Sequence, residues 1–516
     1  MQQRLVSIIA LACVFTACTS SKIRHYQFNQ KTAAPQLQQD VVLLKKILEA
    51  NHPSLYWYTP KDTIDAAFAA AINSITDSLT ETAFRNKVAS VISQIKCGHT
   101  SVRFSANYSK VIEQHRYPCF PLSIKTWGDS MVVLGSFFPR DSTFKRGTII
   151  TAINGRNTQQ LMAKMFPLIS TDGNSNGFKS QVISSNFPSW YKLAFGVDSL
   201  YQVDYINPQG EAKTAAVKNF MPIKKVVTVK DSTTQRKETV TATAKPTSKR
   251  KQKLAQVLAK RSLIIDTANN TALLHVGTFS GRLKPFFRKS LKSLEASRVK
   301  NVIIDIRDNT GGRLENSTSL TKYFIDKPFK TGDTIAALTN NVKYKKYIPQ
   351  SYILWLQMHL FSKKQEDGRY HKQKEEEKIT KPSTKYHFDG NTYVLQGGLS
   401  FSAATLFASN LKGQNNVTIV GEESGGGYYG NTAMFLPTII LPNSKLRVVL
   451  PLYRLVIDSS RQQNGRGLLP DILVQPCSVA IKEGKDLKID TAKKLILKNN
   501  LKQHFSLINI NGHAQQ

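Results

Sequence analysis

The sequence predicts a mixed α/β (α+β) protein of several domains, and three changes of pattern along its 516 residues carry that prediction. Between 36 and 112, apolar residues recur at helical spacing. Between 113 and 222 they form short runs bounded by turn residues, which is typical of strands. Between 263 and 475 strand and helix patterns alternate, as in a layered α/β core. A chain of this length has room for about three domains.

The N-terminus has the pattern of an export signal. Arg4 precedes an apolar run from Leu5 to Phe15, which is too short to span a bilayer, and Thr16-Ala17-Cys18 follows. The pattern resembles a bacterial lipobox, in which Cys18 is lipidated and becomes the first mature residue. We therefore expect a lipid-anchored protein in the cell envelope of a Gram-negative-type bacterium, facing the periplasm. Phe15 replaces the usual Leu at its position, so secretion without a lipid stays the alternative.

The formal net charge of +36 fits two partner classes, nucleic acid and an anionic membrane surface. Much of the excess lies in the Thr-rich stretch 223–262, which is typical of a solvated linker or insertion. No recognisable nucleic-acid fold accompanies it, so we expect no nucleic-acid partner.

Cysteine usage excludes a disulfide scaffold. Outside the signal only Cys97, Cys119 and Cys477 remain, which do not make a disulfide framework. A Cys97–Cys119 bridge stays open for an oxidising compartment. The spacing of Cys and His matches no zinc pattern, and we expect no metal and no cofactor.

The first domain is predicted to be helical. Its first helix stops before Asn51-His52-Pro53, because proline disfavours helix in the residue before it. A second helix is predicted over 65–72, and a third starts near Thr80 and ends at Lys96-Cys97-Gly98-His99-Thr100. His99 therefore lies just past a helix end, next to a glycine. Taken alone, this position favours a loop histidine without a role.

The second domain is predicted to be built of strands at 120–124, 131–134, 148–153 and 201–206. The phrase from Phe144 to Gly155 ends in Asn154-Gly155, a strong tight-turn signal. It resembles the Gly-Asp-x-Ile-x-x-Ile-Asn-Gly phrase of PDZ domains, with Thr148 in place of the aspartate. The resemblance implies capture of a peptide C-terminus along a sheet edge. Any small β domain with an Asn-Gly hairpin is the alternative.

The third region contains the polar turn Arg307-Asp308-Asn309-Thr310-Gly311-Gly312 after a buried strand at 301–306. An insertion at 347–377, apolar and then charged, predicts a helical insertion or lid outside the core. The strand 392–395 then leads through Gly397-Gly398-Leu399-Ser400-Phe401-Ser402-Ala403-Ala404-Thr405 into a helix.

Ser402 is the candidate nucleophile of this strand-to-helix turn. Small neighbours leave its hydroxyl accessible, and the free N–H groups of a helix start can stabilise an oxyanion. Serine is also among the commonest helix caps, and the turn by itself favours that ordinary role.

Four phrases occur in an order that resembles the tail-specific (C-terminal processing) serine peptidase family: 305–312, the Ser402 turn, Val420-Gly421-Glu422 and Gly467-Leu468-Leu469-Pro470-Asp471-Ile472. The tricorn and retinoid-binding-protein-like branch fits best, because a helical domain ending in Gly-His-Thr, a PDZ domain and a catalytic core follow one another there. The resemblance covers about 36–475. It implies a crotonase-like core of ββα layers and a peptide or unfolded protein as substrate.

Roles follow by position from this resemblance. Ser402 matches the nucleophile, whereas Ser400 does not. The N–H of Ala403 with that of Gly312, or of Gly311, would form the oxyanion hole.

This chain lacks the lysine that serves as the general base in another branch of the family. Another branch places a lysine after the Gly-Glu phrase, where this chain has Gly425-Gly426-Gly427. The base is therefore expected to be His99, as in the tricorn-like branch.

Two positions depart from that branch. Gly98 stands where tricorn has a serine before the histidine. The glutamate that would orient the histidine is replaced by Asn464, which accepts an N–H bond but does not stabilise imidazolium by charge. Asp458 is the alternative after a small shift in alignment.

The expected function is a serine endopeptidase of the cell envelope that cleaves unfolded or C-terminal peptide segments through an acyl-enzyme. The alternative is a catalytically weak or inactive peptide-binding lipoprotein of the same fold. The oligomeric state is not predicted. The expected parts are a signal peptide (1–18), a tether (19–35), a helical domain (36–112), a PDZ-like domain (113–222), a basic linker (223–262), the catalytic core (263–475) and a C-terminal tail (476–516).

Overall fold

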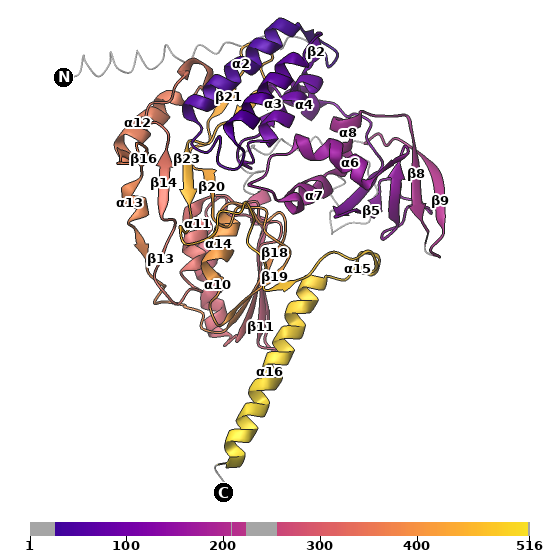
Figure 1. The fold of residues 1–516 in the computed structure, drawn as a ribbon. Helices are drawn as coiled ribbons and strands as arrows, with labels where there is room; N and C mark the ends of the chain where they lie inside the picture. Colours follow the sequence, from indigo (N-terminus) through magenta and orange to yellow (C-terminus); the bar gives the residue numbers. More distant parts are fainter. Residues whose placement is uncertain (1–25, 208, 223–254, 514–516) are drawn as a thin grey trace, which may run out of the picture.

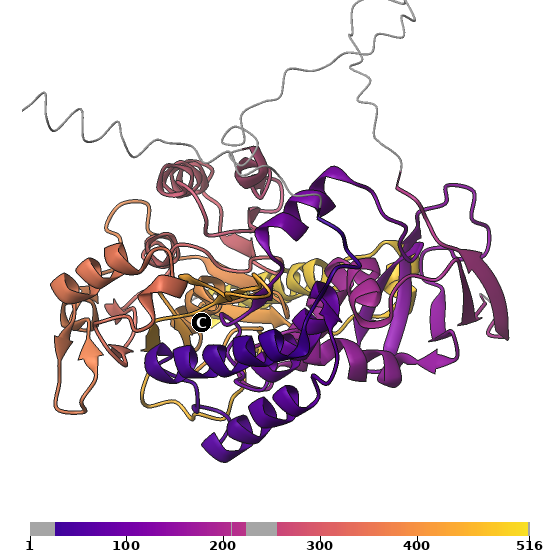
Figure 2. The ribbon, with the colours of Figure 1, turned by 90° about the horizontal axis from the view of Figure 1, so that it is seen from above.

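Figure 1 shows the computed structural model, which describes residues 26–207, 209–222 and 255–513, with side chains as far as 501. Cys18, the signal region and most of the basic linker lie outside the described residues, so what was predicted for them stays a prediction. The described chain forms a helical part, an antiparallel β part and an α/β part, which Figure 2 shows packed side by side. The mixed α/β architecture is therefore confirmed.

The helical part contains α2 (Ala34–Asn51), α3 (Lys61–Asn73), α4 (Glu81–Ser93) and α5 (Ala106–Gln114). The helix α2 ends at Asn51, one residue later than predicted, and His52 caps it before Pro53. Thr80 caps α4, because its side-chain oxygen accepts a hydrogen bond from Ala83 N at 3.3 Å. The predicted helices of this part are thus confirmed.

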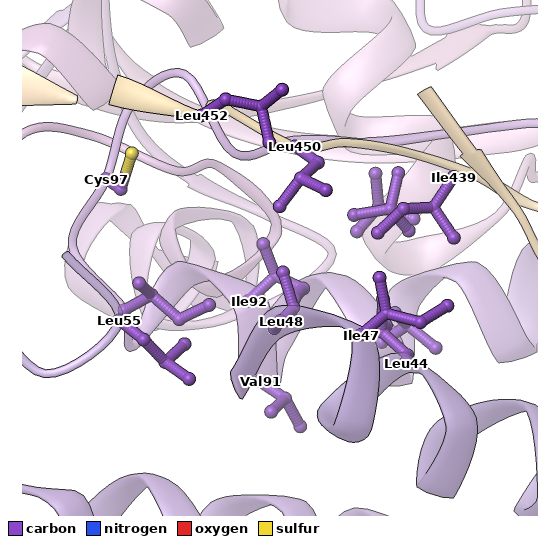
Figure 3. Close-up of a cluster of buried hydrophobic side chains, with 14 of the residues drawn as sticks. Leu44, Ile47, Leu48, Leu55, Val91, Ile92, Cys97, Ile439, Leu450 and Leu452 are labelled. Carbon is purple, nitrogen blue, oxygen red and sulfur yellow. The ribbon is translucent and has the colours of Figure 1, made fainter. Parts of the chain in front are cut away.

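The apolar faces of these helices share a core with the far end of the chain. Leu44, Ile47 and Leu48 of α2 belong to one buried cluster with Ile439 and Leu450 (Figure 3). In addition, β3 (Val102–Arg103) pairs with β22 (Arg447–Val449), which pairs with β21 (Thr438–Ile440). Packing and strand pairing therefore fix the segment around His99 against the third part of the chain.

The β part is one antiparallel sheet with the order β4-β5-β6-β8-β9. Its strands are β4 (Leu122–Trp127), β5 (Ser130–Ser136), β6 (Ile149–Ile153), β8 (Leu200–Ile206) and β9 (Ala212–Lys218), with β7 (Arg156–Asn157) beside β6. Its helices are α6 (Thr158–Met165), α7 (Asn176–Ser185) and α8 (Phe187–Phe195). The predicted strands are confirmed, and the PDZ assignment stays a prediction.

The outer edge of β4 is covered by α7. Thr126 N donates a hydrogen bond to Ser184 Oγ at 2.8 Å, and Thr126 Oγ1 donates to Ser180 O at 3.0 Å. PDZ domains bind peptides by adding a strand to such an edge. A peptide added to β4 would therefore have to displace α7.

The α/β part is organised around a sheet with the order β10-β11-β12-β18-β19-β24. The edge strand β10 is antiparallel to β11, and the other neighbours are parallel. The strands are β10 (Arg261–Asp266), β11 (Thr271–Val276), β12 (Asn301–Asp305), β18 (Asn391–Gln396), β19 (Val417–Gly421) and β24 (Ile472–Leu473).

Alternate residues of β12 serve opposite faces of this sheet. Val302 and Ile304 pack in the cluster that holds α10 (Lys284–Ala296), α11 (Leu314–Thr321) and α14 (Ala403–Leu411). Ile303 packs on the other face against Ala492 and Ile496 of α16 (Leu487–His513). The sequence prediction of a tail over 476–516 was wrong in this respect, because α15 (Ser478–Glu483) and α16 are ordered helices and α16 covers a sheet face.

The insertion at 347–377 is not a separate helical lid. It contributes α12 (Ser351–Phe361), β15 (Lys363–Lys364), β16 (Tyr370–His371) and α13 (Gln373–Glu376). Because β16 pairs with β14, the insertion completes a second sheet with the order β15-β16-β14-β23-β20. The other strands of that sheet are β14 (Thr334–Ala337), β23 (Tyr453–Val456) and β20 (Gly430–Ala433).

The remaining short elements are β1 (Lys31–Thr32), β2 (Leu79–Thr80), β13 (Phe329–Lys330), β17 (Ile379–Thr380) and the 3₁₀ turns Phe166–Leu168 and Lys345–Tyr347. Cys97, Cys119 and Cys477 are free thiols, so the Cys97–Cys119 bridge that the sequence left open is not formed. Among the described helices, none is long and apolar enough to cross a bilayer.

Candidate active site

Ser402 occupies the strand-to-helix turn between β18 and α14 in a strained backbone conformation. Its φ of 55° and ψ of −118° lie where residues with a side chain rarely stay. Ser400 differs, because its hydroxyl is buried, donates to Ile306 O at 2.8 Å and accepts from Gly397 N at 3.1 Å. Ser400 thus holds the turn, and Ser402 presents its hydroxyl.

The imidazole of His99 reaches this hydroxyl from the helical part. His99 Nε2 lies 3.1 Å from Ser402 Oγ, and the ring packs on Phe401 with centroids 4.9 Å apart. Burial lowers the pKa of His99 to about 4, so the ring is neutral near pH 7. A neutral ring with its proton on Nδ1 leaves Nε2 free to accept the Ser402 proton.

The loop that the sequence offered in place of a catalytic lysine lies against the turn. Gly425 N donates to Ser400 O at 2.9 Å, and a Cβ on Gly426 would come within 2.8 Å of Ser402 N. Within the described residues, His99 is the only titratable side chain that hydrogen-bonds Ser402 Oγ.

The partner that faces His99 is neither Asn464 nor Asp458, which corrects the sequence prediction. Asn464 Oδ1 accepts from Arg466 N at 3.0 Å, and Asp458 binds Ser460 and Arg461. The carboxylate that faces His99 Nδ1 instead belongs to Asp172, whose Oδ1 lies 4.0 Å away.

Asp172 is held in a buried pocket between the β part and the helical part. Its Oδ1 accepts a hydrogen bond from Gly98 N at 2.7 Å, while Oδ2 has no partner among the described residues. His99 Nδ1 likewise lacks a hydrogen-bond partner there, because 4.0 Å is too long for one. Burial raises the pKa of Asp172 to about 7 against the effect of the Gly98 N–H.

The loop that contains Asn464 nevertheless packs against the segment of Asp172. Gly465 O accepts a hydrogen bond from Asn174 N at 2.9 Å, and Gly173 touches Gly465 so closely that a Cβ there would lie 2.2 Å from its oxygen. The carboxylate therefore comes from the segment between α6 and α7. No periodicity or motif in that segment signals it, so the sequence did not identify Asp172.

Two N–H groups of the glycine turn and the nucleophile turn have no partner in the described structure. They belong to Gly312 and to Ala403 at the start of α14. Gly311 N donates to Asn309 Oδ1 at 2.9 Å and is engaged. Of the two expected glycines, Gly312 is thus the one whose N–H is free to bind an oxyanion with Ala403.

Asn309 joins this glycine turn to the nucleophile turn. The side chain is fully buried, and its Nδ2 donates to Val276 O at 2.7 Å. Its backbone carbonyl oxygen accepts a hydrogen bond from Phe401 N at 3.0 Å. Arg307 pairs with Asp305 through two side-chain hydrogen bonds and also binds Asp486. The sequence pointed to this turn but missed the role of Asn309.

Part of the chain matches a known protein family. Residues 270–474 match the model of peptidase family S41. This part of the chain is therefore similar to the members of peptidase family S41. The carboxy-terminal processing protease CtpA of Bacillus subtilis (strain 168) is 27% identical over 158 residues, which are 31% of this chain and 26% of that protein. The chain thus matches only about a quarter of the length of that relative.

Two solved structures share the fold over most of the chain. Mature CPAF complexed with lactacystin has a TM-score of 0.61 at 13% identity, covering 90% of this chain and 98% of that one. Mature CPAF has a TM-score of 0.60 at 13% identity, covering 90% and 96%. The chain therefore has the multidomain fold of those proteins. The predicted resemblance to the tail-specific peptidases is confirmed by the S41 match and by the similarity to the processing protease.

Within the described residues, no group of three or more His, Cys, Asp or Glu side chains is arranged to hold a metal ion.

Proposed function

We propose that this S41 protein is a serine endopeptidase that cleaves unfolded or C-terminal peptide segments through an acyl-enzyme, with Ser402 as nucleophile and His99 as base. The observation that carries the proposal is the 3.1 Å contact between His99 Nε2 and Ser402 Oγ. The free N–H groups of Gly312 and Ala403 supply the second requirement, a pair of donors beside the nucleophile.

The chemistry proceeds in two balanced halves. Neutral His99 takes the Ser402 proton as Oγ attacks the peptide carbonyl, and the oxyanion accepts hydrogen bonds from Gly312 and Ala403. The imidazolium then gives that proton to the leaving amine as the C–N bond breaks. Water next attacks the acyl-enzyme, loses a proton to His99, and the proton returns to Ser402 when the acid leaves.

Asp172 acts in this scheme as a positioning residue for His99. When the ring becomes imidazolium, an ionised carboxylate near Nδ1 stabilises the positive charge. The present 4.0 Å separation has to shorten by about 1 Å for a hydrogen bond to form. Such tightening in the substrate complex is common for catalytic hydrogen bonds.

A serine-directed fluorophosphonate probe tests the nucleophile. It should label the wild-type protein and fail to label Ser402→Ala, with heat-denatured wild type as the control for unspecific reaction. Equal labelling of both folded proteins would show that Ser402 is not the nucleophile.

The second candidate is a catalytically weak or inactive peptide-binding lipoprotein of this fold. It is favoured by the two unpartnered atoms, His99 Nδ1 and Asp172 Oδ2. It predicts peptide binding that survives Ser402→Ala, no labelling of the wild type and no cleavage of unfolded casein.

We further propose that the protein works in the cell envelope of a Gram-negative-type bacterium, anchored through Cys18 and facing the periplasm. The support is the N-terminal sequence pattern. Cys18→Ala should release the chain from the membrane fraction or leave it unprocessed. Unchanged processing with release into the medium would instead favour secretion.

A further inference from the structure

The helix α12 lies at the edge of the molecule (Figure 1). It exposes a large apolar face. Its inner face is also apolar, since Leu354 and Met358 belong to the buried core. On the outer face, Tyr352 is 71% exposed, Ile353 67% and Leu360 67%. The other exposed apolar side chains of this face are Trp355, Leu356 and Phe361.

This face is a concentrated patch, whereas isolated apolar residues on a surface are ordinary. The six large apolar side chains lie within ten consecutive residues, 352–361. A surface helix normally carries polar groups on its outer face. The outer face of α12 therefore has the composition of a surface that is covered by something apolar.

Lysines surround the patch. Between 334 and 365 the chain has Lys343, Lys345, Lys346, Lys363 and Lys364 but no Asp or Glu. In the described structure none of these lysines forms an ion pair. Lys345 Nζ lies over the rings of Tyr352 and Trp355, at 5.6 and 5.3 Å from their centroids.

The nearest carboxylates along the chain do not neutralise this rim. Glu366 and Asp367 belong to the hairpin between β15 and β16, and Asp367 contacts His371 at 3.1 Å. Glu376 also contacts His371, and Glu375 contacts Lys372. The lysines on both ends of α12 are therefore available to an external anion.

We propose that α12 and its lysines form a docking surface that lies in the plane of an anionic lipid bilayer. An interfacial helix buries its apolar face at the boundary of head groups and acyl chains, and basic residues beside it bind the anionic head groups. Tyr and Trp suit this boundary because each has an apolar body and a polar tip. The surface is independent of the proposed lipid anchor and of the proposed peptidase activity.

Charge favours a bilayer over a second copy of the chain. A two-fold dimer through α12 would place the same face of both copies together and bring their lysines close to one another. Such like-charge contacts oppose association, whereas a layer of anionic head groups is complementary to the whole rim. We therefore take the dimer as the competing outcome of the test.

The test uses the full chain with Cys18→Ala, so that no lipid is attached, and vesicles of phosphatidylglycerol and phosphatidylcholine with brominated acyl chains. Bromine quenches a tryptophan only when the ring reaches the acyl region. We expect vesicle-dependent quenching that disappears in Trp355→Phe, because Trp57, Trp127 and Trp190 lie elsewhere in the fold.

Two sets of variants separate the apolar face from the lysine rim. The double variant Ile353→Ser, Leu360→Ser should bind vesicles at least about tenfold more weakly, as measured by Trp355 quenching, because two side chains no longer bury apolar surface in the bilayer. Replacing Lys345, Lys346, Lys363 and Lys364 by Gln should lower it by about fivefold per lysine on phosphatidylglycerol and leave phosphatidylcholine unaffected.

The same experiments can overturn the proposal. Quenching that persists in Trp355→Phe, or vesicle binding that is equal in the serine variant, would show that α12 does not enter the bilayer. Loss of a dimer in sedimentation with unchanged quenching would identify the face as a subunit interface. The basic stretch 223–254 is present in every variant, so it cannot produce the differences. Melting curves of the exposed-face variants report whether the fold is kept.

Discussion

The ring of Phe401 packs against the imidazole of His99, with centroids 4.9 Å apart and planes inclined by 37°. Phe401 directly precedes Ser402, and on its other face it stacks on Phe178 of α7 at 4.9 Å. The residue next to the nucleophile thus orients the base and contacts the β part. This contact explains why the position before His99 is glycine.

Gly98→Ser should lower kcat/KM, although serine stands at this position in tricorn. A Cβ on Gly98 would lie 2.5 Å from the Phe401 ring and 3.1 Å from Asp172 N. The ring or the His99 loop must therefore shift, at a cost of about 1–3 kcal/mol in stability. Thermal melting and steady-state kinetics on unfolded casein measure the two effects.

A second variant checks that Phe401 is the cause. Phe401→Leu should recover part of the activity in the Gly98→Ser background, because the smaller side chain makes room for the new Cβ. Additive losses in the double variant would contradict this account and point to Asp172 N as the atom that suffers.

His99→Ala should reduce kcat/KM by about 10²–10⁴-fold, the usual contribution of a general base. The free energy of unfolding should not fall by as much as for a core truncation, because His99 Nδ1 is already without a hydrogen bond. Stopped-time casein assays and denaturant titration check the two statements. His52→Ala is a useful comparison. His52 is also buried, but its Nε2 hydrogen-bonds Thr100 Oγ1 at 2.9 Å and not Ser402. This variant should lower the free energy of unfolding and leave kcat/KM nearly unchanged.

Asp172 should set the pH dependence of the activity. Its pKa is raised to about 7, whereas that of His99 is lowered to about 4, so His99 stays neutral while Asp172 ionises. Because only the ionised carboxylate stabilises imidazolium, kcat/KM should rise with pH through an apparent pKa near 7. In Asp172→Asn this rise should vanish and kcat/KM above pH 8 should fall by about 10²-fold.

Asn464→Ala is the matched control for that prediction. Its amide binds Arg466 N and not His99, so the pH profile should keep the wild-type shape. A flat profile in Asn464→Ala together with a normal one in Asp172→Asn would return the orienting role to the position that the sequence indicated.

Asp172 should also make folding pH-dependent. The folded-state pKa of about 7 lies above the ordinary value of 3.8, so between these values the folded state keeps a proton that the unfolded state has lost. The free energy of unfolding therefore falls as pH rises through this window. Asp172→Asn cannot ionise and keeps an acceptor for Gly98 N, so it should gain about 2–4 kcal/mol over wild type between pH 4 and pH 8. The pKa of His99 is lowered from 6.5 to about 4, so its contribution to the free energy of unfolding rises with pH between these values. This contribution is the same in the wild type and in Asp172→Asn. Denaturant titrations at several pH values measure the difference.

The fold and half of the site could be predicted from local sequence. Strand and helix patterns around β12, β18 and α14 are strongly apolar, and the glycines and serines of the two turns mark where backbone is exposed. Ser402 and His99 lie in phrases that match the family pattern, although each position taken alone favours an ordinary role. Asp172 does not, because its role comes from burial between parts of the chain that meet only after folding. The C-terminal helix was not predicted, although Ile489, Ala492 and Ile496 recur at helical spacing, and its packing on the open face of the sheet appears only in the folded chain.

Asn309→Ala should separate the oxyanion site from the base. The variant loses the acceptor of Gly311 N and the donor to Val276 O, both in a fully buried place. Two buried groups without partners cost about 1–3 kcal/mol each, and the free Gly311–Gly312 turn no longer holds its N–H groups toward Ser402. We expect kcat to fall by about 10²-fold, as for the loss of one oxyanion donor, with KM and the apparent pKa near 7 unchanged.

Asn309→Asp keeps the acceptor for Gly311 N but not the donor to Val276 O, so it should recover part of kcat if the Gly311 bond positions the turn. Equal loss in both variants would assign the effect to the Val276 bond, and a shifted pH profile would mean that Asn309 acts through His99.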